Sequence, residues 1–262
     1  MNIGYVCKDY VEIINFVNYI KNNLYANFFD LTEYKANDLD LIISFGGDGT
    51  ALRCVEYALK CDCPILAVNT GNLGFLCAYE SSNIDKLLND IKNNTYNYQL
   101  RDILQLKLDG RFFYALNDVI IERNHSNRCE TNTFQLLINN EVAQVIDSDG
   151  YIIATPTGST AYSLSAGGAI LHPSSKAFIA TPICSHSSKC SSIVYPNDFT
   201  TKIQLKRANA PANIYCDSDF KGILKVGETL EVILHHKQLK TVKSDDFFAV
   251  LNNKLQAWSK RG

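Results

Sequence analysis

The first hundred residues alternate between short apolar runs and longer segments in which apolar residues recur at helical spacing. The apolar runs predict strands, at residues 3–7, 26–29, 39–45 and 64–68. The helical repeats predict helices, at residues 9–22, 51–61 and 84–91, with Ser82 or Asn83 as the cap of the last. Strands that alternate with helices predict a parallel sheet covered on both faces, and such sheets bind ligands beyond the carboxyl ends of their strands.

The pattern changes near residue 99, where apolar and polar residues begin to alternate. Residues 103–108 alternate, Asp109-Gly110 predicts a hairpin turn, and residues 112–116 return. Further strands are expected at 119–122, 133–138, 142–146, 151–155, 192–195, 202–205, 213–216 and 230–234. A last helix is expected over 245–260, from the spacing of Phe247, Phe248, Leu251, Leu255 and Trp258. The pattern therefore predicts an α/β N-terminal domain and a second, β-rich domain.

Composition and charge argue against some classes of binding partner. The chain has 262 residues, of which 46% are apolar and 20% charged, as in a globular protein with a substantial core. The net charge of −2 gives no basic surplus for nucleic acid or for a membrane surface. No apolar run approaches the roughly 20 residues of a membrane span, and the first five residues lack a signal-peptide pattern. Neither a nucleic-acid partner nor a membrane partner is expected.

Nine cysteines are scattered along the chain without a C-x-x-C pair. Cys61 and Cys63 are too close together for the usual zinc spacing, and His235-His236 fit alternation across a strand better than metal binding. We therefore expect free, buried thiols in a cytoplasmic protein, and no protein-built metal site.

The turn Ser44–Thr50, with the sequence Ser-Phe-Gly-Gly-Asp-Gly-Thr, joins a predicted strand to a predicted helix. Glycines let backbone N–H groups approach a phosphate, and a helix N-terminus favours negative charge, so this turn is a candidate phosphate site. Asp48 is unusual there, because a carboxylate repels phosphate. It indicates either a chemical task, in binding Mg²⁺ or taking a proton from a hydroxyl, or simply a capped turn.

Two further segments are candidates for ligand binding. The polar loop 69–76 also follows a predicted strand, so the two glycine loops are expected to face one crevice. Residues 149–173 are crowded with hydroxyls, small residues and glycine, which permit close approach to a ligand. Ala161 and Leu164 make this stretch too apolar for a plain linker, so ligand binding is favoured over a Ser/Gly-rich connection.

Together these motifs resemble those of the NAD kinase family. They occur in the family's order and spacing: Gly-Gly-Asp-Gly-Thr at 46–50, Asn-Thr-Gly-Asn-Leu-Gly-Phe at 69–75, Asn-Asp at 117–118, and Asp-Gly-Tyr-Ile-Ile-Ala-Thr-Pro-Thr-Gly-Ser-Thr-Ala-Tyr at 149–162. The ending Phe247-Phe-Ala-Val-Leu, with Trp258, resembles the family's final helix. The glycine motif alone is shared with lipid kinases, whereas Thr155–Tyr162 is much more specific. The likeness spans nearly the whole chain.

The resemblance implies 2′-phosphorylation of the adenosine ribose of NAD, with ATP-Mg²⁺ as donor and polyphosphate as an alternative in some members. It implies an α/β N-terminal domain with a parallel Rossmann-like sheet and a β-rich C-terminal domain, with the final helix returning to the first domain. The domains would then be residues 1–98 with 247–262, and residues 99–246. The implied partners are NAD, ATP and further copies of the chain, in a homotetramer or homodimer.

The resemblance also implies roles for individual residues. Asp48 would accept the proton of the ribose hydroxyl, in a loop shaped by Gly46, Gly47, Gly49 and Thr50. Arg53 matches a nucleotide contact, although a solvated helix arginine is an equal alternative. Without the resemblance, Phe75 is plausible as core, and Asn117-Asp118 as a strand-entry turn. The full set of expected contacts beyond the glycine loop is Arg53, Asn72, Phe75, Asn117, Asp118, Asp149, Thr160, Ala161, Tyr162, Ser163, Leu164, Ser165 and Asp217.

The chain departs from the family pattern in three places. Family members often carry Arg two residues before the Asp-Gly pair, where this chain has Asp147. The family's Asn-Arg-Pro is replaced near Lys189–Ser192, and Asp217 is followed by Ser218-Asp219. Asp147 is expected either to repel the new 2′-phosphate or to point to solvent without effect. These departures affect product affinity and the subunit interface rather than the reaction class.

Three other functions compete with this interpretation. A lipid kinase of the same wider group would need a greasy cleft, and the 117–118 and 160–162 motifs argue against it. A non-catalytic nucleotide sensor is disfavoured by the retained Asp48. A hydride-transfer enzyme is weaker still, because the glycine turn lacks the G-x-G-x-x-G of a dinucleotide fold.

Overall fold

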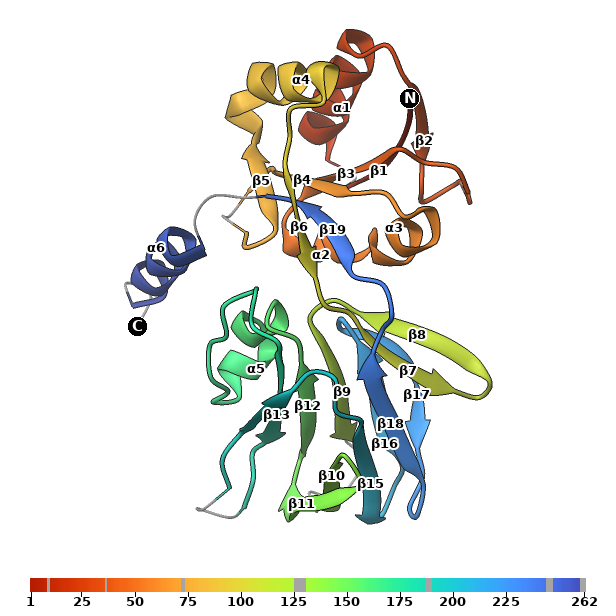
Figure 1. Cartoon of the computed structure of the whole chain (residues 1–262), viewed down its shortest axis with the longest axis vertical. Helices are drawn as coiled ribbons and strands as arrows, with labels where there is room; N and C mark the ends of the chain where they lie inside the picture. Colours follow the sequence, from red (N-terminus) through yellow and green to blue (C-terminus); the bar gives the residue numbers. More distant parts are fainter. Residues whose placement is uncertain are drawn as a thin grey trace. The chain divides into compact units, whose positions relative to one another are not determined.

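A computed structural model of the chain describes residues 1–8, 10–35, 37–71, 74–124, 131–186, 190–243 and 247–259. The chain forms two compact units (Figure 1). Unit 1 comprises residues 1–101 and 238–262, and unit 2 comprises residues 102–237.

Unit 1 contains a seven-stranded sheet in the order β2-β1-β3-β4-β19-β6, with β5 paired to β4. The first four strands are parallel, as the sequence predicted: β1 (Asn2–Cys7), β2 (Asn27–Asp30), β3 (Leu41–Gly46) and β4 (Ile65–Asn69). The other members are β5 (Cys77–Glu80), β6 (Tyr98–Arg101) and β19 (Leu239–Val242). The sequence placed residues 99–246 in the second domain, but the structure places β19 and most of β6 from that range in unit 1. The reason is strand pairing, because β19 pairs with β4 and holds β6 antiparallel beside it.

Helices cover both faces of the unit 1 sheet (Figure 1). On one face, α1 (Val11–Asn23) and α4 (Ile84–Asn93) pack apolar residues such as Val17 and Leu87 against Ile43 of the sheet. The 3-10 turn η1 (Ser81–Asn83) leads into α4, with Asn83 at its N-cap position. The helix predicted over 51–61 is two helices, α2 (Asp48–Leu52) and α3 (Val55–Cys61), which begin three residues earlier than expected and break at Arg53-Cys54.

The last helix, α6 (Phe247–Ser259), belongs to unit 1. Its buried position is Val250, with Phe247 and Leu251 half-buried. Phe248 and Leu255, which helical spacing placed on the apolar face, are 62% and 43% exposed. The buried side of the helix therefore includes Val250 and, from the predicted set, Phe247, which packs on Phe75 of unit 1, but not Phe248 or Leu255. None of the helices in the described ranges is long and apolar enough to cross a membrane.

Unit 2 is built from two six-stranded antiparallel sheets. The first has the order β11-β10-β15-β18-β7-β8, with β7 (Leu104–Leu108), β8 (Arg111–Ala115), β10 (Asn132–Ile138), β11 (Glu141–Ser148), β15 (Thr201–Arg207) and β18 (Thr229–Leu234). The second has the order β14-β13-β12-β9-β16-β17, with β9 (Asp118–Arg123), β12 (Gly150–Ala154), β13 (Ala177–Ile183), β14 (Ile193–Pro196), β16 (Ala212–Cys216) and β17 (Asp219–Leu224).

The two sheets of unit 2 share one apolar core. Phe134 from the first sheet and Tyr151 from the second are fully buried and meet edge to face at 6.1 Å between ring centroids. A smaller apolar cluster around Ile152 and Ile179 lies on the other face of the second sheet, where Leu171 packs against it. The segment 158–171, with η2 (Gly158–Thr160) and α5 (Tyr162–Ser165), reaches this face.

Eight cysteines fall within the described residues, and all eight are free thiols. Cys54, Cys63, Cys77 and Cys216 are buried, whereas Cys184 is exposed. Cys129 lies outside the described residues.

Candidate functional site

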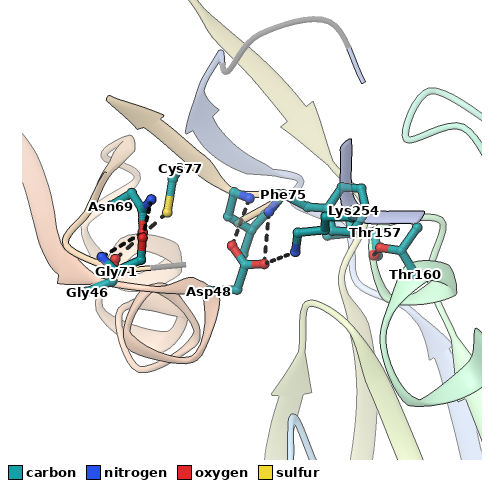
Figure 2. Close-up of polar contacts among 10 residues, drawn as sticks. Gly46, Asp48, Asn69, Gly71, Phe75, Cys77, Thr157, Thr160 and Lys254 are labelled. Atoms are coloured by element: carbon teal, nitrogen blue, oxygen red, sulfur yellow. Dashed lines mark hydrogen bonds and ion pairs between the residues drawn. The ribbon is translucent and has the colours of Figure 1, made fainter. Parts of the chain in front are cut away.

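Asp48 begins helix α2 directly beyond the carboxyl end of β3. Its two carboxylate oxygens accept backbone hydrogen bonds from the loop that follows β4: Phe75 N–H to Oδ2 at 2.9 Å and Leu76 N–H to Oδ1 at 2.9 Å. Figure 2 shows the carboxylate held against this stretch of main chain. A carboxylate with both oxygens fixed in this way has one orientation, and its side chain is still 29% exposed. The loops after β3 and β4 therefore meet at Asp48, as the sequence predicted for the two glycine loops.

Glycines surround Asp48 for two different reasons. A Cβ atom on Gly74 would lie 2.2 Å from Asp48 Oδ1, and one on Gly46 would lie 2.1 Å from Thr50 Oγ1, so both positions need glycine for packing. A Cβ on Gly47 would have no protein atom within 4 Å. Gly47 thus keeps a space open that the protein itself does not fill.

That space belongs to a pocket of about 290 Å³ in unit 1. Its lining comes from the loops that follow β1, β3 and β4 and from the first turns of α1 and α2: Lys8, Tyr10, Ile13, Gly47, Asp48, Thr70, Gly71 and Gly74. One cationic side chain, one carboxylate and three glycines are a lining suited to a phosphate group that approaches the backbone closely. The five-residue α2 is too short for a strong helix dipole, so this suitability comes from the glycine backbone and Lys8.

The other residues predicted around the glycine loop differ in how they relate to the site. Thr50 is buried against Gly46, and Gly49 lies in α2 beside Asp48. Phe75 is half-buried and supplies the N–H to Asp48, so its backbone serves the site directly. Arg53 is exposed at the end of α2, and it is not among the described residues that line the pocket. Asn72 lies outside the described residues.

In unit 2, Asp217 organises the start of β9. Its carboxylate accepts hydrogen bonds from the backbone N–H groups of Leu116 at 2.8 Å, Asn117 at 2.7 Å and Asp118 at 3.3 Å. Asp217 and Ser218 have φ angles of 48° and 72°, which make the tight turn between β16 and β17. The predicted residues Asn117, Asp118 and Asp217 are therefore one cluster, brought together across about a hundred residues of sequence.

Both acids of this cluster have raised pKa values. Burial, reinforced by the nearby Asp217 carboxylate, raises the pKa of Asp118 to about 7. Burial raises the pKa of Asp217 to about 6, although its three backbone donors act in the opposite direction. Near neutral pH, Asp118 is thus poised between a neutral form that donates a hydrogen bond and a charged form that only accepts.

The segment Thr155–Ser165 folds back onto Asn117. Thr155 donates its hydroxyl to the Leu116 carbonyl at 2.6 Å and its N–H to the Asn117 carbonyl at 2.9 Å. Tyr162 is 39% exposed, and burial together with the carboxylates of Glu122, Asp149 and Asp118 raises its pKa. Tyr162 therefore lies in the electrostatic neighbourhood of two other predicted site residues.

The remaining residues of this segment differ in accessibility. Ser163 is buried and its hydroxyl pairs with that of Thr181 at 2.9 Å, a bond within the unit. Thr160, Ala161 and Leu164 are half-buried, and Ser165 is exposed. Ser163 accordingly holds α5 in place, while its neighbours remain accessible.

Asp149 and Asp147 each lie beside an arginine. Asp149 Oδ1 is 2.8 Å from Arg123 Nε, and both side chains are largely buried. Asp147 accepts a hydrogen bond from the Thr133 hydroxyl and lies 3.4 Å from Arg207, whose side chain is 71% exposed. The negative charge expected at Asp147 thus has a cation next to it, which weakens its repulsion of a nearby phosphate.

One residue of the site has no counterpart in the sequence prediction. Lys254 Nζ, on α6, is 3.6 Å from Asp48 Oδ2 and 4.1 Å from the centre of the Phe75 ring (Figure 2). It lies 206 positions after Asp48, and helical spacing of apolar residues gave no reason to select it. Within the described residues there is no group of three or more His, Cys, Asp or Glu side chains that could hold a metal ion.

Known family models match a segment in each of the two units. The family model of the ATP-NAD kinase N-terminal domain matches residues 17–96, and that of the ATP-NAD kinase C-terminal domain matches residues 116–244. The chain belongs to the NAD kinase family. It is therefore a kinase, and the NAD kinase interpretation is favoured over a lipid kinase, a nucleotide sensor or a hydride-transfer enzyme.

Relatives within the family resemble the chain over most of its length. The NAD kinase of Sulfurimonas denitrificans is 37% identical over 227 residues, which cover 84% of this chain and 78% of that protein. The NAD kinase of Clostridium beijerinckii is 34% identical over 262 residues, which cover 97% of this chain and 89% of that protein.

Two solved structures share the fold. Yeast NADH kinase complexed with NADH has a TM-score of 0.82 at 23% identity, covering 98% of this chain and 87% of its own. An NAD kinase from Archaeoglobus fulgidus in complex with ATP has a TM-score of 0.81 at 21% identity, covering 98% of this chain and 99% of its own. The α/β unit, the β-rich unit and the final C-terminal helix predicted from the sequence are thus those of NAD kinases.

Proposed function

We propose that this kinase transfers the γ-phosphoryl group of ATP to the 2′-hydroxyl of the adenosine ribose of NAD, giving NADP, with Asp48 as the proton acceptor. The observation that carries the proposal is the Asp48 carboxylate, fixed by two backbone N–H groups in the wall of a glycine-lined pocket.

Asp48 meets the requirements of a general base. A ribose hydroxyl is a poor nucleophile near neutral pH, and a carboxylate within hydrogen-bond reach takes its proton as the new bond to phosphorus forms, an effect of roughly 10²–10⁴ in rate. Each carboxylate oxygen can accept about two hydrogen bonds, and the backbone of Phe75 and Leu76 uses one on each. A lone pair therefore remains for the hydroxyl, and the backbone bonds fix its direction.

The unit 1 pocket suits the phosphates of ATP. Phosphoryl transfer depends on positioning and charge neutralisation, which backbone N–H groups of the glycine loops and Lys8 can supply. Mg²⁺ would accompany ATP, bound to its phosphates, and would offset their charge. Gly46, Gly49, Thr50 and Phe75 support this loop, and Arg53 and Asn72 remain proposed nucleotide contacts.

The unit 2 cluster suits NAD. Asn117 and Asp118 offer amide and carboxyl groups for hydrogen bonds to ribose or amide, and Asp217 fixes the backbone that carries them. Asp149 supplies a further carboxylate near a polar end of NAD. The accessible residues of the segment Thr160–Ser165 would enclose an aromatic ring, namely Thr160, Ala161, Tyr162, Leu164 and Ser165. Ser163 contributes by holding α5.

Assembly and location complete the proposal. We expect a homotetramer or homodimer, since antiparallel sheets with exposed apolar residues such as Val142 and Val145 on β11 offer surfaces for self-association. We expect a cytoplasmic enzyme, where NAD and ATP are available. Light scattering of the purified protein tests the assembly, and a fully active monomer would contradict it.

A coupled assay tests the reaction. Purified protein is incubated with ATP, Mg²⁺ and NAD, and NADP is read with an NADP-specific dehydrogenase. We expect NADP formation that requires both NAD and Mg²⁺. Phosphorylation of diacylglycerol or a sphingoid base, with NADP no higher than in a protein-free control, would instead identify a lipid kinase. Replacing ATP with polyphosphate, and NAD with NADH, defines the preferred donor and acceptor.

A further inference from the structure

The C-terminal helix brings a positive charge to Asp48. Lys254 Nζ is 3.6 Å from Asp48 Oδ2, and the two side chains are only 18% and 29% exposed. The same ammonium group lies 4.1 Å from the centre of the Phe75 ring, within the range of a cation–π contact. Lys254 therefore has two partners that hold its charge beside the carboxylate rather than in solvent.

The position of Lys254 is set by the packing of α6. Phe247 and Lys254 are two helical turns apart, so they lie on one face of the helix, with buried Val250 between them. The Phe247 ring packs on Phe75, with ring centroids 6.0 Å apart. Phe75 in turn donates its N–H to Asp48. Phe75 is thus shared by the helix, the lysine and the carboxylate.

This arrangement addresses an electrostatic problem at the pocket. Asp48 lines the space that the proposed function assigns to the phosphates of ATP. A carboxylate without a neighbouring positive charge would repel a triphosphate at short range. The repulsion energy of two like charges about 4 Å apart is several-fold larger in a partly buried site than in water. The cation among the pocket's described lining residues, Lys8, is exposed, so solvent screens its charge more than that of the partly buried Lys254.

We propose that Lys254 is a positioning residue of the phosphoryl-transfer site: it balances the charge of Asp48 and holds the carboxylate in place, so that ATP can bind next to a charged proton acceptor. The cation that a P-loop kinase carries in its phosphate loop would here be supplied to the acceptor carboxylate by the last helix. This inference rests on the proposed function, in that it requires ATP to bind at the Asp48 pocket.

A double-mutant cycle on ATP binding tests the inference. Binding of ATP in the presence of Mg²⁺ is measured by isothermal titration calorimetry on the full chain, without NAD, so that the readout does not depend on turnover. The variants are Lys254→Met, Asp48→Asn and the double substitution. Methionine keeps a long, flexible stem that packs on the Phe75 ring, so that mainly the charge is lost. Lys92→Met is the matched control, because it removes an exposed lysine from the last turn of α4 in the same unit.

We expect Lys254→Met to weaken ATP binding about tenfold at low salt, with a smaller loss at high salt, and Lys92→Met to change it by less than about twofold. In the Asp48→Asn background, where there is no carboxylate to balance, Lys254→Met should have less than about a twofold effect. Lys254→Arg, which keeps the charge, should bind ATP like the parent protein. Circular dichroism checks folding, and Lys254→Gln replaces the methionine variant if that variant is unfolded.

Each other outcome overturns a distinct claim. If the parent protein binds ATP and Lys254→Met binds it equally well, Lys254 does not balance Asp48 and this inference fails alone. If Lys254→Met weakens binding equally with and without the Asp48 carboxylate, the lysine acts on ATP directly and not through Asp48. If the parent protein does not bind ATP at all, the proposed donor is wrong, and the inference fails with it.

Discussion

Gly158 lies directly against the main chain of Asn117: a Cβ atom on Gly158 would be 2.0 Å from the Asn117 carbonyl oxygen and 2.6 Å from its Cα. The obstacle is backbone, which cannot move aside as a flexible side chain can. This close approach is what allows the segment Thr155–Ser165 to fold back onto the start of β9.

Gly158→Ala is therefore expected to destabilise unit 2 by about 3 kcal/mol or more, at the upper end for overpacking. Chemical denaturation followed by fluorescence measures the change. The matched control is Gly49→Ala, since a Cβ there meets no atom within 4 Å. Equal stability of the two variants would show that the backbone contact between residues 158 and 117 is not required.

Gly47→Ala is expected to leave the fold intact and to weaken ATP binding by about tenfold or more, because the added methyl group occupies the pocket and nothing else. Calorimetric titration with ATP and thermal melting measure the two properties. Gly46→Ala is the contrasting variant, since its Cβ would meet Thr50, and it should lose stability. An unchanged ATP affinity in Gly47→Ala would show that the phosphates of ATP do not bind at Gly47.

Asp48→Asn is expected to lower kcat by at least about a hundredfold, the low end for loss of a general base. The amide cannot accept hydrogen bonds with both of its terminal atoms, so one of the two N–H groups from Phe75 and Leu76 loses its acceptor and the Tm should also fall modestly. Steady-state kinetics and a melting curve distinguish the two effects. Turnover within a few-fold of the parent enzyme would exclude Asp48 as the proton acceptor.

The stability of the protein is expected to fall as the pH rises from about 4 to about 7. Asp118 has its pKa raised from 3.8 to about 7 on folding, so its stabilising contribution is complete below its unfolded pKa and is lost as the pH rises through the folded one. Asp217 acts in the same direction through about 6. The slope from each group is at most about 1.4 kcal/mol per pH unit. Urea unfolding at several pH values should show this slope, and Asp118→Asn should reduce it; an unchanged slope would contradict the assignment.

Asp147→Arg is expected to tighten inhibition by NADP, with NAD affinity unchanged, if residue 147 lies near the new 2′-phosphate. The gain should be modest and should shrink as salt is added, because Arg207 already offsets the charge of Asp147. Product-inhibition constants at low and high salt measure it. An unchanged constant at low salt would mean that Asp147 points to solvent and has no effect on product release.

Much of the fold follows from local sequence. The hairpin turns at Asp109-Gly110 and Asn139-Asn140 were recognisable because these residues accept positive φ, and all four have it. The turn at Asp217-Ser218 also has positive φ at both residues, but serine rarely adopts it, so β17 was not predicted. Strand β19 has only four residues, and its identity as a member of the first sheet depends on pairing with β4, which no local pattern encodes.

The candidate site shows the same division. Asp48, Asn117 and the Thr155–Tyr162 segment lie in motifs that could be recognised in the sequence. The Asp217 carboxylate accepts hydrogen bonds from the backbone at the start of β9, and Lys254 contacts Asp48; both contacts join residues that are far apart in the chain. Such contacts depend on how the elements pack. The periodicity of α6 selected Phe247, which packs on Phe75, but also Phe248 and Leu255, which are exposed.

The sheet order of unit 1 also has a consequence for biosynthesis. Strand β6 is joined to its sheet through β19, and β19 follows the whole of unit 2 in the chain. A ribosome that has produced the first hundred residues has therefore made β6 but not the strand that connects it to β4. Unit 2, with its own complete sheets, can fold as it emerges, whereas unit 1 must wait for residues 239–242. Until then β6 has no strand beside it, and the start of β4 at Ile65, which β5 does not cover, also lacks its partner. These unpaired strands are sites where a nascent chain can bind a chaperone or mispair with a neighbour.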